Sequence, residues 1–289
     1  MSGLPGAPWG SALIVAQCDV NRMSLQITPS STAPVFEVFA SFQGEGLYAG
    51  SPQVFLRLAG CPLRCAWCDT PASWETSDQA TARVRTREGV RQESAWATPA
   101  EVAGWIDEVD PTGRMTVSVT GGEPLIWPEF LLELRPLLGR RRVHLETAGA
   151  HPRSLGVVLD ACDHVSADLK LPEDMGPPEF VGFSESEPCP TTHEEWRTAR
   201  RSFLESICGR DACCKLVVAG GRAAHAYAEI LADVAECAPE LVLFLQPATP
   251  VKGIAAPASE TLSELTMAAE AVGLRARVLG QLHRAWGLP

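Results

Sequence analysis

The sequence predicts an α/β protein built as a partial (β/α)6 barrel, and three observations lead to this fold class. Apolar runs of strand length recur from Val54 onward. Helix-like stretches separate these runs, and such alternation implies parallel strands joined by right-handed crossovers. The six or seven units are fewer than the eight of a closed barrel. An open doubly wound sheet is the alternative that this pattern leaves open.

Several of the expected strands are nearly continuous runs of Val and Leu, as in strands buried on both faces. They are Val54–Leu58, Thr116–Val119, Arg142–Glu146, His164–Leu169, Lys215–Val218, Leu241–Leu245 and Arg275–Leu279. The expected helices between them are Pro128–Leu138, Pro152–Asp160, Thr191–Ile207, Arg222–Cys237 and Pro257–Val272. Three of these helices begin with Pro, which is favoured at the first helical position.

The chain of 289 residues is expected to form a single domain over residues 35–289. Residues 1–34 are rich in Ser, Pro, Gly and Ala and predict a flexible N-terminal extension. Two segments interrupt the alternation of strands and helices. Residues 75–98 are polar and rich in Arg, and residues 171–195 are rich in Pro and acidic side chains. We expect both to be insertions on the core, mobile or at an interface.

Composition and charge narrow the class of protein and its location. A formal net charge of -11 argues against a protein that grips nucleic acid phosphates. No apolar run reaches the roughly 18 residues needed to span a bilayer, so no membrane role is expected. Ten cysteines in a chain of this length do not resemble a short secreted disulfide scaffold. We therefore expect reduced thiols and a cytoplasmic enzyme.

Three clustered cysteines, Cys61, Cys65 and Cys68, carry the strongest chemical signal. A disulfide would use two of them, and a structural zinc site would need a fourth ligand. A four-iron cluster usually takes four thiolates as well, so three thiolates would leave one iron open. An incomplete ligand set is typical of a catalytic metal site, because the vacant position can bind a reactant.

Polar or Gly-rich residues follow six of the expected strands, where a parallel barrel binds its ligands. Each motif alone could be a turn, a cap or a surface ion pair. Together they predict one site on one face of the barrel. After the first strand the site includes the cysteine loop, and then Thr120–Pro124, Glu146–Gly149, Asp168 with Lys170, Gln246 with Pro247, and Gly280–His283.

The cysteine spacing C-x3-C-x2-C, with Trp67 before the last Cys and GGEP at a later strand end, resembles the radical S-adenosylmethionine (SAM) superfamily. In that superfamily three thiolates hold a [4Fe–4S] cluster, and SAM binds the fourth iron. The segment FASFQGEGLYAGSPQVFLRLAGCPLRCAWCDT and the late QLH resemble the 7-carboxy-7-deazaguanine synthase family. This resemblance covers roughly residues 35–74, 115–170 and 213–289.

The resemblance implies a role for each matching residue. Cluster ligands are Cys61, Cys65 and Cys68, and SAM contacts are Trp67, Gly122, Glu123, Asp168, Lys170 and Gln246. Thr70 would help to bind Mg²⁺, and substrate contacts are Phe42, Gln43, Gly44, Glu45, Arg57, Thr120, His283 and Pro289. The substrate that the resemblance implies is a reduced pterin, whose edge is rich in N–H donors. Glu45 and the terminal carboxylate are suitable acceptors for these donors. Arg57 and Mg²⁺ would neutralise the substrate carboxylate.

The reaction that the resemblance implies is a ring contraction by a SAM-derived radical, with no catalytic side chain of its own. It converts 6-carboxy-5,6,7,8-tetrahydropterin into 7-carboxy-7-deazaguanine with loss of ammonia, in queuosine and deazapurine biosynthesis. An electron donor such as flavodoxin or ferredoxin and a homodimer are also implied.

Two other functions remain open. The sequence ADLK around Asp168 resembles glycyl-radical activating enzymes, which act on a protein partner. A non-enzymatic zinc or redox module would use the cysteine loop but leave the other strand ends unexplained. The cysteines outside the loop, such as Cys189, Cys208, Cys213 and Cys214, lack a paired C-x2-C spacing. We interpret these as free thiols, because buried cysteine behaves as a small hydrophobic residue.

Overall fold

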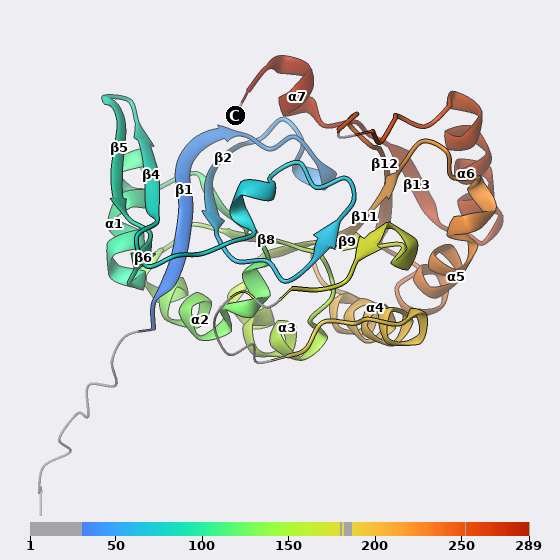
Figure 1. Cartoon of the computed structure of the whole chain (residues 1–289), viewed down its shortest axis with the longest axis horizontal. Helices are drawn as coiled ribbons and strands as arrows, with labels where there is room; N and C mark the ends of the chain where they lie inside the picture. The colour runs from blue at the N-terminus through green and yellow to red at the C-terminus, as the bar shows by residue number, and fades with distance from the viewer. Residues whose placement is uncertain (1–30, 180, 182–186, 252, 289) are drawn as a thin grey trace, which may run out of the picture.

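The computed structural model describes residues 31–179, 181, 187–251 and 253–288, and a curved sheet forms their frame (Figure 1). The sheet order is β13-β12-β11-β9-β8-β7-β2-β1-β4-β5, with β6 paired to β1. The long strands are β1 (Ala33–Phe42), β2 (Pro52–Leu58), β4 (Thr81–Thr86), β5 (Gly89–Ser94), β7 (Thr116–Gly121), β8 (Val143–Thr147), β9 (His164–Leu169), β11 (Ala212–Val218), β12 (Val242–Pro247) and β13 (Arg275–Val278). The two-residue strands are β3 (Arg64–Cys65), β6 (Trp96–Ala97) and β10 (Met175–Gly176).

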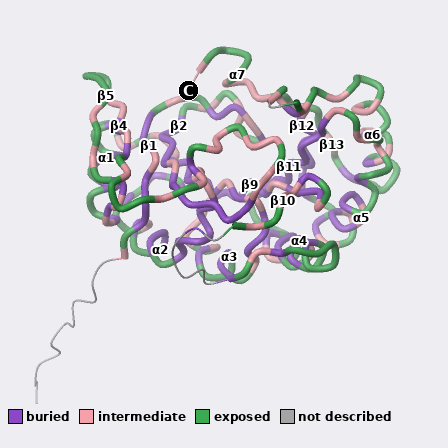
Figure 2. Tube along the Cα trace, in the orientation of Figure 1, coloured by how far each residue is buried: buried purple, intermediate pink, exposed green. Residues whose placement is uncertain are grey.

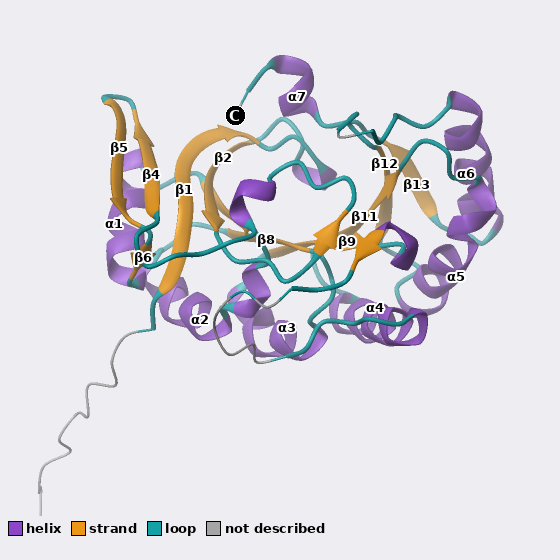
Figure 3. Ribbon diagram, in the orientation of Figure 1, coloured by secondary structure: helices purple, strands orange, loops and turns teal. Residues whose placement is uncertain are grey.

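Seven neighbouring strands of the described chain, from β2 and β7 through β13, run parallel to one another. Helices connect them in chain order: α1 (Pro99–Val109), α2 (Pro128–Leu137), α3 (Pro152–Val158), α4 (His193–Ile207), α5 (Ala228–Cys237) and α6 (Ser259–Ala271). A short helix, α7 (Leu282–Trp286), follows β13. Figure 3 shows α1 to α6 along the outer side of the sheet, which confirms the partial barrel and excludes the doubly wound alternative.

The hydrophobic core lies between the sheet and these outer helices (Figure 2). Leu56 and Leu145 contribute from the strands, and Ile106, Leu134 and Phe203 from the helices, all almost fully buried. Because one face of the sheet is packed in this way, side chains on the other face and at the strand ends are available for a binding site. The helices of the described residues include none long and apolar enough to cross a bilayer.

Every strand and helix expected from the apolar runs is present, and most of their ends lie within a few residues of the expected ones. The helix expected from Arg222 begins as a 3-10 turn over Ala224–Tyr227 and continues as α5 from Ala228. The strand β1, however, was not expected, and it pairs antiparallel with β2. It begins at Ala33, whose Cα partner in β6 is Ala97, so the sheet starts inside the expected extension. The rest of that extension, residues 1–30, lies outside the described residues.

The expected insertion over residues 75–98 is ordered sheet. Strands β4 and β5 form a hairpin, and β4 runs parallel to β1 at the edge of the sheet. Ala82 and Val84 point into the core, whereas Arg83 and Arg85 face out toward Glu37. This alternation with a period of two residues is the signature of a half-buried strand, and the many Arg residues concealed it.

Helix α1 follows this hairpin and was also not expected. Thr98 accepts a bond from the backbone N–H of Glu101, whose carboxylate in turn accepts one from the backbone of Thr98. This capping box, with Pro99 in the first turn, explains why the helix starts there. In the expected insertion over residues 171–195, the short strand β10 pairs with β3 of the cysteine loop. Residues 180 and 182–186 of that insertion lie outside the described residues.

Candidate active site

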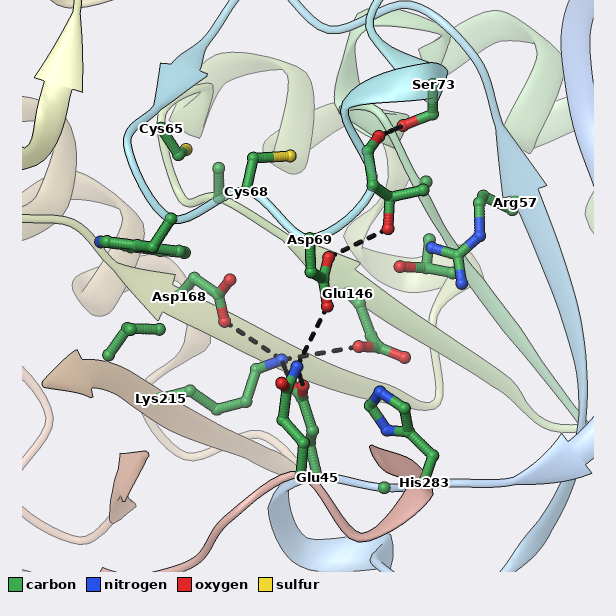
Figure 4. A pocket seen from close by; sticks show the side chains of 18 of the residues that line it. Glu45, Arg57, Cys65, Cys68, Asp69, Ser73, Glu146, Asp168, Lys215 and His283 are labelled. Atoms are coloured by element: carbon green, nitrogen blue, oxygen red, sulfur yellow. Dashed lines mark hydrogen bonds and ion pairs between the residues drawn. The ribbon is translucent and has the colours of Figure 1, made fainter. Parts of the chain in front are cut away.

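A cavity of about 300 Å³ opens at the carboxyl ends of the parallel strands (Figure 4). It gathers most of the site residues predicted from the sequence, although they are spread over some 240 positions of the chain. The predicted residues that line it are Phe42, Gln43, Gly44, Glu45, Arg57, Cys61, Cys65, Trp67, Cys68, Thr70, Thr120, Gly122, Asp168, Lys170, Gln246 and His283. Glu123 lies outside the lining, and Pro289 lies outside the described residues.

The three cysteines lie on the loop that follows β2, with Cys61 buried and Cys65 and Cys68 half-buried. The loop is held by backbone bonds from Cys61 N–H to Trp74 (3.0 Å) and from Cys68 N–H to the carbonyl of Cys65 (3.2 Å). Burial raises the pKa of the Cys65 thiol to about 11. At neutral pH this thiol therefore stays protonated unless a metal cation binds it, because metal binding releases the proton of a cysteine ligand.

The donor set of this loop fits an iron–sulfur cluster. Cys61, Cys65 and Cys68 all line the same cavity, and such clusters are held by cysteine thiolates. None of the nine cysteines in the described part forms a disulfide, which leaves these three available.

The Gly-Gly pair at the end of β7 allows close packing against the cysteine loop. A Cβ on Gly121 would lie 2.1 Å from the carbonyl oxygen of Leu58, and one on Gly122 would lie 2.1 Å from that of Gly60. Both approaches are far shorter than an ordinary contact of about 3.5 Å. The backbone N–H of Gly122 donates to Leu58 at 2.9 Å. The glycines thus fix the position of the loop that carries the cysteines.

Glu123 ties the ends of two strands together from inside the protein and is fully buried. One carboxylate oxygen accepts bonds from Leu125 N–H (3.0 Å) and from the Thr147 hydroxyl (2.7 Å), and the other accepts one from Ala148 N–H (2.8 Å). Its predicted contact with the ammonium group of SAM stays a prediction. The observed bonds give Glu123 a structural role in the cavity wall.

On the cysteine side of the cavity, Lys170 bonds Asp168 and stacks on an indole. Its Nζ lies 2.9 Å from Asp168 Oδ2 and 4.2 Å from the centroid of the Trp67 ring. Burial alone would lower the pKa of Lys170, but Asp168 outweighs it and raises that pKa. Asp168 and Lys170 are therefore a charged pair within the wall, and both face the space beside the cysteines.

Lys215 lines the cavity and was not predicted from the sequence. Glu146 was expected at this strand end, but no role was assigned to it. Glu146 Oε1 accepts bonds from Gln43 Nε2 (3.0 Å) and from the Ser118 hydroxyl (2.7 Å). Lys215 Nζ lies 2.5 Å from Glu45 Oε2. The signal for Lys215 was a single charged residue in the otherwise apolar strand ACCKLVV, because a buried ammonium requires carboxylate partners.

The C-terminal segment closes one side of the cavity by packing on the loop after β1. Leu282 N–H donates to the carbonyl of Gly44 at 3.0 Å, and the His283 ring lies directly over Gly44. Gln281 Nε2 bonds Glu45 Oε1 at 2.8 Å. The two segments that carry the most specific sequence resemblance, QGEG and QLH, thus form one wall. Burial lowers the pKa of His283, so its ring is neutral at physiological pH.

Oxygen ligands suited to Mg²⁺ lie beside the last cysteine. The Thr70 hydroxyl donates to Asp69 Oδ1 at 2.9 Å, and both residues line the cavity. Burial would raise the pKa of Asp69, but bonds from Gln281 and Thr70 outweigh it, so this carboxyl is ionised. Mg²⁺ keeps several water ligands and needs only one or two ligands from the protein. One hydroxyl near an anion therefore fits what the protein would have to supply.

A buried chain of polar side chains supports Gln43 from the interior. Burial lowers the pKa of His144 to about 3, so its ring is neutral. The ring contacts Gln43 Nε2 through Nδ1 at 3.4 Å and Ser166 Oγ through Nε2 at 2.8 Å. The chain continues through His164 to the exposed carboxylate of Asp211, 2.8 Å away. These contacts fix the amide of Gln43, whose Oε1 accepts from the backbone N–H of Glu45 at 3.0 Å.

A partial barrel whose strand ends surround three cysteines defines a class of protein, the radical SAM enzymes. The family model described as the radical SAM superfamily matches residues 56–178. Among curated relatives, the 7-carboxy-7-deazaguanine synthase of Methanothermobacter thermautotrophicus is 32% identical over 260 residues, which is 89% of this chain and 98% of the relative. The chain belongs to the 7-carboxy-7-deazaguanine synthase family.

A second relative and a solved structure agree with this assignment. The 7-carboxy-7-deazaguanine synthase of Geobacter sulfurreducens is 32% identical over 271 residues, covering 88% of this chain and 97% of the relative. The crystal structure of QueE from Escherichia coli matches with a TM-score of 0.51 at 24% identity, covering 86% of this chain and 93% of that one. The structural match shows the shared fold. The family and fold class predicted from the sequence are confirmed, and the roles of individual site residues stay predictions.

Proposed function

We propose that this chain is a 7-carboxy-7-deazaguanine synthase, which converts 6-carboxy-5,6,7,8-tetrahydropterin into 7-carboxy-7-deazaguanine and ammonia. One observation supports this most directly. A single cavity is lined by the cysteine loop, by the QGEG loop and by the QLH segment, so cofactor ligands and substrate-binding groups face the same space. The atoms of the substrate equal those of 7-carboxy-7-deazaguanine plus one ammonia, so the overall reaction needs no net oxidant or reductant.

The cofactors would occupy the cysteine side of this cavity. Cys61, Cys65 and Cys68 would hold the [4Fe–4S] cluster, and the strand ends near Trp67 and Lys170 would contact SAM. When bound and reduced, the cluster with SAM supplies a carbon-centred radical that can remove a hydrogen atom from an unreactive C–H bond. The protein orients the reactants and excludes water, which prevents side reactions of the radical.

The substrate would occupy the opposite side, against the loop after β1 and the C-terminal segment. Glu45 and Glu146 would be carboxylate acceptors for the N–H groups of the pterin edge, and hydrogen bonds to a charged acceptor are about twice as strong as neutral ones. Arg57, which is paired with Glu37 at 3.1 Å, faces the cavity and would attract the substrate carboxylate. The neutral His283 ring and Thr120 supply further polar contacts along the same wall.

The remaining partners follow from the same proposal. Thr70 would hold Mg²⁺ beside the substrate carboxylate, where the cation completes neutralisation of that anion. A one-electron donor such as flavodoxin or ferredoxin would reduce the cluster. We also propose that the enzyme works as a homodimer in the cytoplasm, as expected from the family resemblance.

The alternative of a glycyl-radical activating enzyme requires space for a protein substrate and leaves the C-terminus free to vary. Here the C-terminal segment packs on Gly44 and Glu45 and forms part of the cavity wall. A cavity of about 300 Å³ closed in this way suits a small molecule. The structure therefore favours the pterin substrate.

An anaerobic turnover experiment tests the proposal. The cluster is reconstituted, SAM, Mg²⁺ and a reductant are added, and 6-carboxy-5,6,7,8-tetrahydropterin is supplied. We expect 7-carboxy-7-deazaguanine by mass, and none from the Cys68→Ser variant. Formation of 5′-deoxyadenosine without this product would retain the radical SAM class and contradict the substrate assignment.

A further inference from the structure

Lys215 lies at the centre of the cavity wall and contacts three carboxylates from three different elements (Figure 4). Its Nζ is 2.5 Å from Glu45 Oε2, 3.1 Å from Asp168 Oδ1 and 3.5 Å from Glu146 Oε2. An ammonium group has three N–H bonds and no acceptor, so each carboxylate can take one of them. The side chain is only 4% exposed, which makes these charges interact through a low-dielectric interior.

The second oxygen of each carboxylate is also occupied, by donors on other elements. These donors are Gln246 and Gln281 on Glu45, Gln43 and Ser118 on Glu146, and Lys170 on Asp168. Lys215 therefore bonds the QGEG loop and the strands β8 and β9 directly, and Glu45 links this cluster to the C-terminal segment through Gln281. Lys215 thus connects the substrate side of the cavity to the cysteine side.

The choice of lysine at this position is unusual for the chain. Only three of its 24 basic residues are lysines, at positions 170, 215 and 252, and two of these three line the cavity. Arginine is a planar fork that suits one or two carboxylates in its own plane, whereas an ammonium can point its donors in three directions. Three carboxylates grouped around one point therefore require lysine.

Without this cation, Glu45 and Glu146 would lose the ammonium group that they share, and Lys170 would remain as the partner of Asp168. Neighbouring carboxylates without a cation repel each other, which favours uptake of a proton by one of them. We propose that Lys215 is a positioning residue that gathers Glu45, Glu146 and Asp168 around one cation, so that Glu45 and Glu146 meet the pterin edge as carboxylate acceptors in fixed orientations. This inference rests on the proposed function, because it concerns how the same cavity recognises the pterin.

The electrostatics of the neighbouring groups agree with this geometry. Burial would raise the pKa of Glu146, but Lys215 together with the weaker effects of its other neighbours holds that pKa at about 2. Burial would lower the pKa of Lys215, and its carboxylate partners raise it well above the usual value instead. The titratable groups that act on one another around Lys215 are Glu45, Glu146, His144, Asp168, Lys170, Cys213 and His283.

A binding experiment across pH separates this role from simple packing. The probe is 6-carboxypterin, the oxidised and fluorescent analogue of the substrate, added to the reconstituted protein with SAM between about pH 6 and 7.5, below the pH at which the pterin ring itself loses a proton. His144 is neutral over this range because burial lowers its pKa to about 3, and burial also lowers the pKa of His283 from its usual value. We expect the wild-type affinity to be nearly independent of pH. In Lys215→Met we expect affinity at least tenfold weaker at pH 6, with partial recovery as the pH rises.

Two further variants complete the set. Lys215→Arg keeps the charge but not the geometry, so its affinity should fall while its pH dependence stays flat. Arg210→Met removes an exposed cation that pairs with Asp160 and should behave as wild type. Wild-type affinity in Lys215→Met at every pH would overturn the inference. If the wild-type protein itself bound no pterin, the proposed function would fail instead.

A second measurement does not depend on the folding of any Met variant. Because the chain has only three lysines, protein labelled with ¹³C at the lysine ε-carbon gives three signals, and Lys215→Arg identifies one of them. Addition of 6-carboxypterin to the wild type should shift that signal, since the pterin would bond the carboxylates held by Lys215. An unchanged signal at saturating 6-carboxypterin would contradict the inference.

Discussion

Gly44→Ala isolates the contact between the QGEG loop and the C-terminal segment. The added Cβ would lie 2.0 Å from Nδ1 and 2.9 Å from Cγ of the His283 ring. Gly44 does not have a positive φ, so the backbone accepts alanine and the clash falls on the ring alone. The ring must retreat by about 1.5 Å to reach an ordinary contact distance. A misplacement of about 1 Å can lower a rate by about 100-fold, because reacting groups must be held in near-attack geometry.

We therefore expect kcat/KM to fall by about 10- to 100-fold in Gly44→Ala, with thermal unfolding within a few degrees of wild type. The assay is the anaerobic turnover experiment combined with circular dichroism melting. The matched control is Gly156→Ala in α3, where a Cβ meets nothing within 4 Å. This control should keep full activity and gain about 0.5–1 kcal/mol of stability, because alanine is the better helix former.

A double variant refines the test. If the loss arises from displacement of the ring, Gly44→Ala combined with His283→Ala should be no worse than His283→Ala alone, since the two changes act on one contact. If Gly44→Ala were as active as Gly156→Ala, the contact between Gly44 and the His283 ring would not matter for turnover. Independent, additive losses in the double variant would also show that the two changes do not act through one contact.

Three other changes test different parts of the structure. Cys68→Ser should lower bound iron after reconstitution while leaving the circular dichroism spectrum unchanged; full iron content would contradict its assignment as a ligand. His144→Phe breaks the buried chain behind Gln43 and should lower the free energy of unfolding by about 1–3 kcal/mol in urea titration, since a buried donor loses its partner. Asp233→Ala removes the buried carboxylate that pairs with Arg200 and should cost about 3–5 kcal/mol, whereas a loss below 1 kcal/mol would argue against a buried pair. Burial would raise the pKa of Asp233, but Arg201 and Arg200 lower it below 3.8, so its stabilisation is complete above about pH 4 and is lost as the pH falls through the lowered value. In Asp233→Asn that acid-dependent component of unfolding should be absent.

The parallel part of the fold was readable from the sequence because buried strands leave continuous apolar runs such as LVLFL. Strands β1 and β4 were not predicted, since β1 pairs antiparallel with β2 and β4 alternates Ala82 and Val84 with arginines. A strand with one solvated face, such as β4, alternates apolar and polar residues in place of a continuous apolar run. Propensity alone gave little reason to expect a strand in such an Arg-rich segment.

The site residues that belong to local sequence motifs were predicted well. The residues that reach the site through contacts between distant parts of the chain were predicted less well. The cysteines and the strand-end motifs follow from local patterns. Lys215 bonds Glu45 across 170 positions of the chain, and no local pattern contains both residues. Glu123 belongs to a recognisable motif, but only the folded structure shows that its carboxylate is used within the wall. Sequence motifs thus identified the cavity, and the structure distinguished lining residues from supporting ones.

A crystal structure of the reconstituted protein with SAM and 6-carboxypterin bound tests most directly whether one cavity holds both cofactor and substrate. We expect a [4Fe–4S] cluster on Cys61, Cys65 and Cys68, with the pterin in the same cavity between Glu45 and Arg57. A pterin bound at another place, or a cluster held by other cysteines, would contradict the claim that one cavity serves both cofactor and substrate.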